Sequence, residues 1–547
     1  MLKVATKNEI RRIEASANAQ GLSYQQMMEN AGRAVGKRVI DILHGKENAK
    51  VTVIVGSGSN GGDGLVAGRI IAQESDASVR FYLMGTRSET DTNYTTLRDA
   101  GLELINLIDD NEGQHLQRVV ADADVILDAL FGIGVRLPLG EEAIWILKTI
   151  DETLKNRIKN QIEHRDISME LIPSFDNSPK TNRSFYVIAV DTPSGLNCDT
   201  GEVSPYTLVA DETITFIAAK PGLFEYPAVS RVGVLRVASL EIPDDLPELQ
   251  EIKHVVSHPK LINDYLPVRS RISNKGNFGK ILVVGGSSSY IGALGLSAMA
   301  AYRTGCGLVT IASIEPVIRS LSSHLFEPTW QSLFESDGSI GSDVDSQLID
   351  HLCNSDSILL GPGLGTKSPA KNFLLNTLSK LGENSPLILD ADALNILSEF
   401  ENWWSLLPRN TILTPHPGEM ARLAKTSVKE VLNQRWQIAK AKSKEWNVIL
   451  VLKGANTLIA NPQGSVVAIP FATDALATAG TGDVLAGLIA GFVGQGLAPE
   501  IAAQVGAYLH GLAGIFAVAN MGNSRSVLAG DVLNAVPQAL TKIENAL

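Results

Sequence analysis

The sequence predicts an α/β protein with two large domains, each built on an open and mainly parallel β-sheet. A chain of 547 residues is too long for a single hydrophobic core. Short apolar runs alternate with helix-like segments in both halves, as parallel strands and their connecting helices do. Glycine-rich or carboxylate-bearing loops follow several of these runs. These observations indicate two doubly wound units in one chain.

In the first half, apolar residues recur at helical spacing over residues 24–43 and predict an amphipathic helix. The polar stretch 151–184 interrupts the alternation, and we interpret it as an exposed, partly helical insertion. Buried parallel strands are predicted at residues 51–55, 79–83, 125–127 and 186–190.

In the second half, a hairpin is predicted with its turn at Asn461 to Gly464, and two helices close the chain. The two alternating segments and the stretch between them predict a first domain over residues 1–240, a connector over 241–275 and a second domain over 276–547. Strands before the hairpin are predicted at residues 281–284, 308–312, 357–360, 386–389, 411–413 and 448–452.

Composition excludes several classes of protein. The formal charge of −12 disfavours binding to nucleic acid or to an anionic membrane, because both need a basic surface. Cys198, Cys306 and Cys353 are too few and too scattered for a disulfide framework or a zinc site, so we expect a reducing cytoplasm. The N-terminus has no signal-peptide pattern. The apolar stretch from Val484 is too short for a bilayer and predicts a buried helix.

The loop after the strand at 51–55 carries the first candidate site. Gly56, Gly58 and Gly61 match the dinucleotide fingerprint G-x-G-x-x-G in a strand-to-helix setting, which predicts a Rossmann-like domain. The acidic residue that should follow the second strand is missing, so a conventional NAD-dependent dehydrogenase is disfavoured. Asn60 and Asp63 instead place oxygen-bearing side chains in the loop.

Two more strand ends in this half carry polar side chains. Asp128 follows the strand at 125–127, and Asp191 with Ser194 follows the strand at 186–190. Because ligands bind beyond the carboxyl ends of parallel strands, we expect these residues to gather with Asn60 at one edge. Their oxygens suit a hydrated or alkali cation, and a carboxylate there can act as acid or base. The alternative is that each Asp only caps the following turn or helix.

The motifs GSGSNGGDGL, DALFGIG, VDTPSGL and AAKPGL, with MMENAG before them, resemble the N-terminal YjeF family, the NAD(P)H-hydrate epimerases. The resemblance covers about residues 5–240 and departs from the family at Ser59, usually Asn, and in the length of the 151–184 stretch. It implies a potassium ion held by Asn60, Asp128 and Ser194, and a catalytic role for Asp191. It also implies that the hydrated dinucleotide contacts Ser59, Asn60, Gly61, Gly62, Asp63, Gly132, Ile133, Gly134, Val135, Arg136, Leu137, Pro138 and Asp191.

In the second half, AGTGDVLAG (479–487) places glycines and a threonine before an apolar helix. The free amides and dipole of that helix start favour a phosphoryl group. Asp483, in the first turn, is placed to accept a proton from a substrate hydroxyl. Alternatively, Asp483 only matches the helix dipole at the surface.

Four other loops are predicted on the same side of this sheet, namely GPGLG, DADALN, TPHPGEMARL and KGANT. Taken singly, Asp390 and Asp392 fit helix caps, His416 a packing or turn residue and Lys453 a solvated cation. Their convergence at one edge favours a shared pocket.

These loops, with KGNFGKILVVGGS and YIGALGLSA, resemble the ribokinase-like fold and its NAD(P)H-hydrate dehydratase branch over residues 275–547. The resemblance implies ADP, or ATP, as phosphoryl donor with Mg²⁺, and a catalytic role for Asp483. It implies that the hydrated nicotinamide contacts Ala293, Gly363, His416, Pro417, Gly418, Glu419, Met420, Ala421, Arg422 and Asp483. The nucleotide would contact Lys453, Gly454, Ala455, Asn456, Thr457, Thr473, Asp474, Ala475, Leu476, Ala477, Thr478, Ala479, Gly480, Thr481 and Gly482.

The two resemblances together imply repair of hydrated NADH and NADPH (NADHX and NADPHX) by an epimerase and a dehydratase that assemble as a homo-oligomer. One rival hypothesis is a small-molecule kinase for a vitamin-precursor alcohol, with a regulatory first domain. Another keeps the first domain as a noncatalytic binding or scaffold module; the cluster of Asn60, Asp128, Asp191 and Ser194 argues against it.

Overall fold

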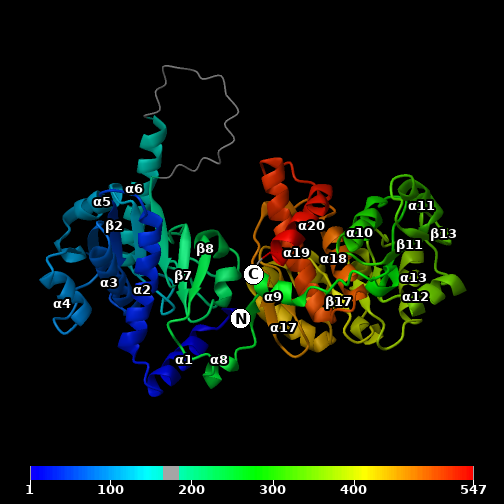
Figure 1. Cartoon of the computed structure of the whole chain (residues 1–547), viewed down its shortest axis with the longest axis horizontal. Coiled ribbons are helices and arrows are strands. Elements are labelled where there is room, and N and C mark those ends of the chain that lie inside the picture. The colour runs from blue at the N-terminus through cyan, green and yellow to red at the C-terminus, as the bar shows by residue number, and fades with distance from the viewer. Residues whose placement is uncertain (1, 164–183, 546–547) are drawn as a thin grey trace. The chain divides into compact units, whose positions relative to one another are not determined.

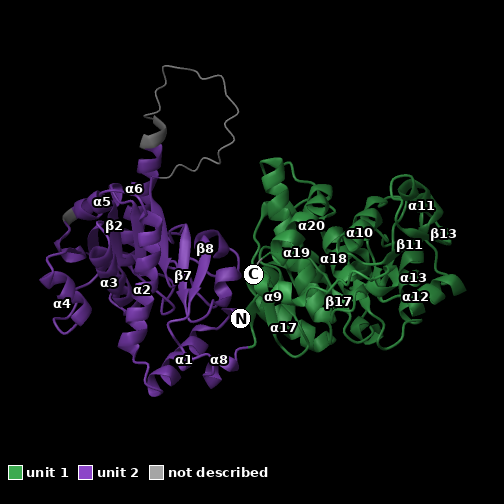
Figure 2. Ribbon diagram, in the orientation of Figure 1, with its two compact units in different colours: residues 1, 253–547 green, residues 2–252 purple. Residues whose placement is uncertain are grey.

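A computed structural model describes residues 2–163 and 184–545 of the chain. The chain divides into two compact units, one of residues 2–252 and one that begins at Lys253 (Figure 2). The division falls within the stretch 241–275 that the sequence suggested as a connector.

The first unit alternates strands with helices for most of its length (Figure 1). Its strands are β1 (Leu2–Lys3), β2 (Lys50–Val55), β3 (Ser78–Leu83), β4 (Glu103–Asn106), β5 (Val125–Ala129), β6 (Tyr186–Val190), β7 (Glu212–Phe216) and β8 (Val234–Ala238). Its helices are α1 (Lys7–Ala19), α2 (Tyr24–Leu43), α3 (Ser59–Glu74), α4 (Thr92–Asp99), α5 (Gln114–Ala121), α6 (Glu141–Glu163), α7 (Val229–Val232) and α8 (Pro247–Gln250), with 3₁₀ turns η1 (Leu107–Asp109), η2 (Asn111–Gly113) and η3 (Pro221–Phe224).

The sheet of this unit is parallel throughout, in the order β4-β3-β2-β5-β6-β7-β8. Strand order reverses between β2 and β5, so the loops after these two strands diverge and open a crevice at the carboxyl edge. The glycine-rich loop follows β2, and Asp128 lies near the end of β5. The predicted Rossmann-like, doubly wound sheet is confirmed.

Side chains that alternate along each strand supply two separate cores. Val53, Val55 and Leu127 pack on one face, with residues of α1, α2 and α3. Ile54 and Ile126 pack on the other face, with residues of α5 and α6. Helices on both faces explain why these strands are nearly all apolar and were predictable from sequence.

The four predicted strands are found as β2, β3, β5 and β6, and the helix predicted over residues 24–43 is α2. The sequence did not predict β4, β7 and β8. Strands β4 and β8 lie at the two sheet edges and are only partly buried, so they lack a strong apolar run. Helix α6 accounts for the start of the proposed 151–184 insertion, and the rest of that prediction lies outside the described residues.

The second unit contains the other elements (Figure 1). Its strands are β9 (Val255–Val256), β10 (Lys280–Val284), β11 (Leu308–Ile314), β12 (Thr329–Leu333), β13 (Glu335–Ser336), β14 (Ser339–Ile340), β15 (Ser357–Leu360), β16 (Leu387–Leu389), β17 (Ile412–Leu413), β18 (Ile449–Leu452), β19 (Leu458–Ala460) and β20 (Val466–Ala468). Its helices are α9 (Pro259–Tyr265), α10 (Gly292–Arg303), α11 (Glu315–Ser322), α12 (Ser346–Asn354), α13 (Ser368–Leu378), α14 (Asp392–Leu397), α15 (Pro417–Leu423), α16 (Val428–Asn433), α17 (Arg435–Trp446), α18 (Thr481–Gly494), α19 (Pro499–Met521) and α20 (Ala529–Glu544), with 3₁₀ turns η4 (Lys275–Phe278), η5 (Trp403–Leu406) and η6 (Asp474–Leu476).

The main sheet of this unit has the order β9-β20-β19-β18-β17-β16-β15-β10-β11-β12. Strands β18 to β12 in that order run parallel, and β19 and β20 form the predicted antiparallel hairpin. All six strands predicted before the hairpin are present, and the expected α/β arrangement is confirmed. The loops after β15 to β18 therefore share one edge of the sheet, as the site prediction requires.

Helices α18 and α19 lie in the interior of this unit. All but two of the residues of α18 are buried, which confirms the predicted buried helix after Val484. Helix α19 has the length and mean hydropathy (1.5) of a membrane-spanning helix, but 72% of its most apolar window is buried within the protein. That burial is typical of a core helix.

Gly487 of α18 tests how closely this helix packs on α10. A Cβ atom at Gly487 would lie 2.1 Å from the Ser297 carbonyl oxygen, so Gly487→Ala must push the two helices apart. We expect it to lower the free energy of unfolding by about 1–3 kcal/mol. Gly530→Ala in α20 is the control, because its new methyl group meets open space and adds helix propensity. Equal melting temperatures for both variants would contradict this packing.

Candidate active sites

The first unit has a cavity of about 360 Å³ at the carboxyl edge of its sheet. Part of the predicted dinucleotide set lines it: Ser59, Asn60, Asp63, Gly132, Ile133, Gly134, Val135 and Asp191. Gly61 and Gly62 lie behind the wall, where added Cβ atoms would strike Arg87 and Met28. Arg136, Leu137 and Pro138 are not among the lining residues. The cavity therefore uses the start of the 132–138 loop and not its end.

Asp191 is held by a buried lysine that the sequence analysis did not assign to the site. Nζ of Lys220 lies 2.7 Å from Oδ1 of Asp191 and also donates to Oγ1 of Thr215 and to the Phe216 carbonyl. The Ile133 amide donates to Oδ2 of Asp191. Asp191 adopts a left-handed backbone conformation, φ 65°, which is uncommon outside glycine and concentrates at functional sites. Backbone and ion pair together fix this carboxylate at the cavity wall.

Asn60 and Asp191 converge on Gly132. A Cβ atom at Gly132 would lie 2.9 Å from Oδ2 of Asp191 and 3.0 Å from Oδ1 of Asn60, so a side chain there would displace these groups. Asn60 is buried, and within residues 2–163 and 184–545 neither polar atom of its side chain has a hydrogen-bond partner. Buried amides are nearly always paired, so Asn60 is prepared for a ligand or an ion.

Asp128 and Ser194 form a second buried pair. The Ser194 hydroxyl donates to Oδ1 of Asp128 at 2.5 Å, and its amide donates to Oδ2 at 2.9 Å. Burial raises the pKa of Asp128, and the Ser194 hydrogen bonds oppose that rise. The structure thus brings together two of the three residues that the resemblance assigned to potassium. Asn60, Asp128 and Ser194 offer amide, carboxylate and hydroxyl oxygens as ligand atoms. Oxygen ligands of this kind fit an alkali cation.

Two further carboxyl groups face the same cavity. Glu14, from α1, and Asp63, near the start of α3, line the main cavity and an adjoining cavity of about 130 Å³. Burial and the charge of Asp191 raise the pKa of both groups. Glu14 escaped the sequence analysis because α1 carries no motif, and nothing in its spacing points to the later strand ends.

In the second unit, a pocket of about 230 Å³ lies beside the N-terminus of α18. Nine residues of the predicted nucleotide set line it: Lys453, Gly454, Ala455, Thr457, Thr473, Leu476, Ala477, Thr481 and Gly482. The other six, Asn456, Asp474, Ala475, Thr478, Ala479 and Gly480, are not among its lining residues. Thr478 instead donates to the Val527 carbonyl, and Asp474 accepts from Ser524.

Lys453 is oriented by Asp390. Its Nζ lies 2.9 Å from Oδ1 of Asp390, which also accepts a hydrogen bond from the Thr414 hydroxyl. Ala391, the next residue, has φ 53° and ψ −117°, a strained conformation for a residue with a Cβ atom. The N-cap of α14 is Ala391 and receives no side-chain hydrogen bond, so Asp390 is an ion-pair partner of Lys453 and not a helix cap. Nζ of Lys453 also comes within 3.4 Å of a Cβ position at Gly482, next to the free amides of α18.

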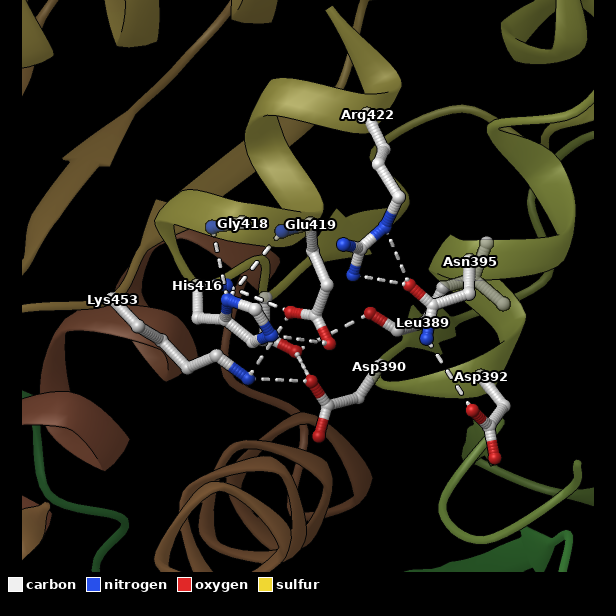
Figure 3. A network of polar contacts seen from close by, with 10 residues as sticks. Leu389, Asp390, Asp392, Asn395, His416, Gly418, Glu419, Arg422 and Lys453 are labelled. Carbon is white, nitrogen blue, oxygen red and sulfur yellow. Dashed lines mark hydrogen bonds and ion pairs between the residues drawn. The ribbon is translucent and has the colours of Figure 1, made fainter. Parts of the chain in front are cut away.

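Glu419 and His416 complete this polar network (Figure 3). Figure 3 shows the side chains of Lys453, Glu419 and His416 gathered around Asp390, whereas Arg422 turns to Asn395. Oε2 of Glu419 lies 3.7 Å from Nζ of Lys453 and accepts from the His416 amide. Burial raises the pKa of Glu419 to about 7, and the charge of Lys453 opposes that rise.

Asp483 belongs to the same electrostatic cluster. Burial, followed by the charge of Asp390, raises the pKa of Asp483 to about 7. Lys453 keeps a raised pKa: burial lowers it, but Asp390 and Glu419 outweigh that effect. One lysine thus faces three carboxyl groups, and some of them hold a proton near neutral pH.

The two remaining predicted positions lie next to each other. Gly363 has φ 63°, and a Cβ atom there would meet the Tyr290 carbonyl oxygen at 2.6 Å and Cβ of Ala293 at 3.4 Å. A residue with a side chain would be strained at this backbone angle. Within the described part of the chain, no group of three or more His, Cys, Asp or Glu has the arrangement of a metal site.

Comparisons with known proteins agree with both halves of this description. A family model for NAD(P)H-hydrate dehydratase matches residues 281–538, and one for the YjeF-related protein N-terminus matches residues 24–222. The bifunctional NAD(P)H-hydrate repair enzyme Nnr of Moorella thermoacetica is 34% identical over 95% of this chain and 92% of its own length. This chain belongs to the bifunctional NAD(P)H-hydrate repair enzyme family. The Escherichia coli protein of the same name is 31% identical over 97% of this chain and 92% of its own length.

A solved structure is also similar to the dehydratase half of this repair-family chain. It is the ADP/ATP-dependent NAD(P)H-hydrate dehydratase of Bacillus subtilis, co-crystallized with ATP/Mg²⁺. It is 29% identical, covers 53% of this chain and 98% of its own length, and has a TM-score of 0.47. The family resemblances inferred from the motifs are confirmed by the two family models and by the full-length relatives.

The Asp191–Lys220 pair makes a prediction about stability. Lys220→Met leaves Asp191 buried without its cation and should cost about 3–5 kcal/mol of unfolding free energy. Adding Asp191→Asn should recover much of that loss. Lys155→Met is the control, because its ion pair with Asp151 is exposed and contributes little. The measurement is denaturant-dependent hydrogen exchange in β6 and β7; strictly additive effects of the two substitutions would contradict the pairing.

Proposed function

We propose that this chain restores hydrated NADH and NADPH, with epimerisation in the first domain and nucleotide-dependent dehydration in the second. The observation that carries the proposal is the position of Asp483. It is a largely buried carboxyl at the N-terminus of α18, beside Lys453 and the free amides of a glycine-rich loop. Lys453 and Gly482 line the pocket beside α18, whereas Asp483, the next residue of the helix, is not among the lining residues. A cation and an anion site therefore adjoin a base.

The dehydration follows from this geometry. Asp483 accepts the proton of the ring hydroxyl while the hydroxyl oxygen attacks the terminal phosphorus of ADP or ATP, and the bond to the bridging oxygen breaks. Lys453 and the Gly482 amide stabilise the charge on the phosphoryl oxygens, since the Thr481 amide already donates to the Thr478 carbonyl. The ring nitrogen then expels phosphate, and loss of a proton from the neighbouring carbon restores the dihydropyridine. Phosphate is a far better leaving group than hydroxide, which is why a nucleotide is consumed.

Ala293, Gly363 and the α15 residues from His416 to Arg422 would hold the hydrated ring opposite the nucleotide. Mg²⁺ would accompany the nucleotide phosphates and neutralise part of their charge. Glu419 and Asp390 are the nearest carboxyl groups to Lys453, and both are already engaged by that cation.

In the first domain, Asp191 would act on the hydroxyl-bearing ring carbon inside the cavity lined by Asn60 and the 132–135 loop. Potassium would be held by Asn60, Asp128 and Ser194, and it would supply a fixed positive charge for the dinucleotide. The side-chain amide of Asn60, which has no hydrogen-bond partner among the residues that the structure describes, supports this assignment. An epimerase in the same chain makes both epimers available to a stereospecific dehydratase.

The wider setting of the enzyme is also a proposal. Cys198, Cys306 and Cys353 are all free thiols, which supports a reducing cytoplasm. We expect a homo-oligomer, as the family resemblance implies, acting on NADHX and NADPHX and binding neither nucleic acid nor membrane.

The direct test mixes purified protein with both epimers of hydrated NADH and ADP, and follows the absorbance of reduced nicotinamide. Wild-type protein should restore all of it, and Asp483→Ala should slow recovery by about 10²- to 10⁴-fold. Asp191→Ala should restore one epimer quickly and leave the other to its slow spontaneous reaction. Asp343→Asn, an exposed surface carboxylate, is the control. A stable phosphorylated product without NADH would instead support the rival small-molecule kinase.

The pKa of Asp483 predicts the pH dependence of dehydration. A base works in its ionised form, so raising its pKa from an ordinary value to about 7 means that kcat/KM falls as pH drops through 7. This acidic fall of kcat/KM should move to lower pH in Glu419→Gln, since Glu419 contributes to the raised pKa of Asp483. Because the carboxyl groups interact, the measured value belongs to the cluster. A limb near pH 4 in the wild type would contradict the assignment.

A further inference from the structure

Helix α19 forms one wall of the nucleotide pocket, although the sequence motifs do not include it. A Cβ atom at Gly511 would lie 2.4 Å from Cδ2 of Phe471, and one at Gly514 would lie 2.9 Å from Cδ2 of Leu476. Phe471 and Leu476 both line the pocket. Glycines on α19 therefore let the lining side chains pack directly against this helix.

His510 is the residue that α19 contributes to the lining, within the part of the chain that the structure describes. It is 8% exposed, and its Nε2 atom has no hydrogen-bond partner among residues 2–163 and 184–545. A buried polar atom without a partner is destabilising and rare in native proteins. Because His510 lines the pocket, a ligand bound there can complete its hydrogen bonding.

The surroundings of His510 determine which ligand group can form a hydrogen bond with its imidazole ring. Burial lowers the pKa of His510 to about 4, so the ring is neutral at physiological pH. A hydrogen bond with the Thr481 backbone raises the pKa of His510. A hydrogen bond from a ring N–H to a carbonyl oxygen has this effect. A neutral imidazole has one N–H, so its other nitrogen is an acceptor. An acceptor does not suit phosphate oxygens, but it suits a hydroxyl or amino group.

The position of His510 in the pocket further limits which part of a ligand it can contact. Its contact with Thr481 places the ring next to the phosphate end of the pocket, where Lys453 and Gly482 lie. The following residue, Gly511, touches Phe471 at the apolar end. His510 therefore stands between the two ends. In a nucleotide, the sugar joins the base to the phosphates.

We propose that His510 accepts a hydrogen bond from a ribose hydroxyl of the bound nucleotide and thereby selects ribonucleotides over deoxyribonucleotides. This inference rests on the proposed function to the extent that a nucleoside diphosphate or triphosphate occupies the pocket. It assigns to the core helix α19 a direct part in nucleotide specificity.

Calorimetric titration with ADP, 2′-deoxy-ADP and 3′-deoxy-ADP tests the proposal without hydrated coenzyme. Wild-type protein should bind ADP about tenfold more tightly than one of the two analogues, the effect of one hydrogen bond. His510→Leu should bind ADP about tenfold more weakly and lose the discrimination. His510→Gln keeps an acceptor and should retain part of it, and His324→Leu, at an exposed histidine, should match the wild type.

Two outcomes would overturn the proposal. One is wild-type protein that binds both deoxy analogues as tightly as ADP. The other is a folded His510→Leu or His510→Gln variant with undiminished affinity and discrimination. Recovery of NADH by the wild type is measured in parallel. Tight ADP binding with no recovery would contradict the proposed dehydration and leave the role of His510 standing.

Discussion

Each domain depends on a lysine paired with an aspartate that follows a parallel strand; the lysine is fully buried in the first domain and partly buried in the second. Lys220 lies 2.7 Å from Asp191 in the first domain, and Lys453 lies 2.9 Å from Asp390 in the second. Buried charges are costly unless each is paired and hydrogen-bonded, so each partner fixes the other. In both domains the pair lies at the carboxyl edge of the sheet, where the strand-end loops leave room for a ligand.

These pairs also set the chemistry of the groups around them. Lys220 pairs with Asp191, whereas Lys453 pairs with Asp390 and also lies 3.7 Å from Glu419. Further carboxyl groups lie near each pair. Burial and like charge raise the pKa of Glu14 and Asp63 in the first cavity. They also raise the pKa of Asp483 and Glu419 in the second. Protonation near neutral pH is thereby available at the second site, and at the first site the raised pKa values favour the protonated form. Epimerisation and dehydration both need proton transfer.

Much of this arrangement could be predicted from the sequence, because strongly apolar strands followed by Asp or glycine place those residues at one sheet edge. Lys220 was missed although its motif was recognised, since β7 before it is rich in threonine and gave no apolar signal. Asp390 looked like a helix cap until its contact with Lys453 was visible. His510 lies in mid-helix, and only the packing of α19 on Phe471 brings it to the pocket. Local patterns predict strand ends, whereas contacts between distant elements depend on tertiary packing.

The central chemical claim is that the second domain transfers a phosphoryl group to the ring hydroxyl before that oxygen leaves. Hydrated NADH labelled with ¹⁸O in this hydroxyl, incubated with ADP and the full-length protein, tests it directly. The account predicts that the released inorganic phosphate carries the label, one ¹⁸O atom for each NADH restored. Label found in water, with unlabelled phosphate, would contradict it.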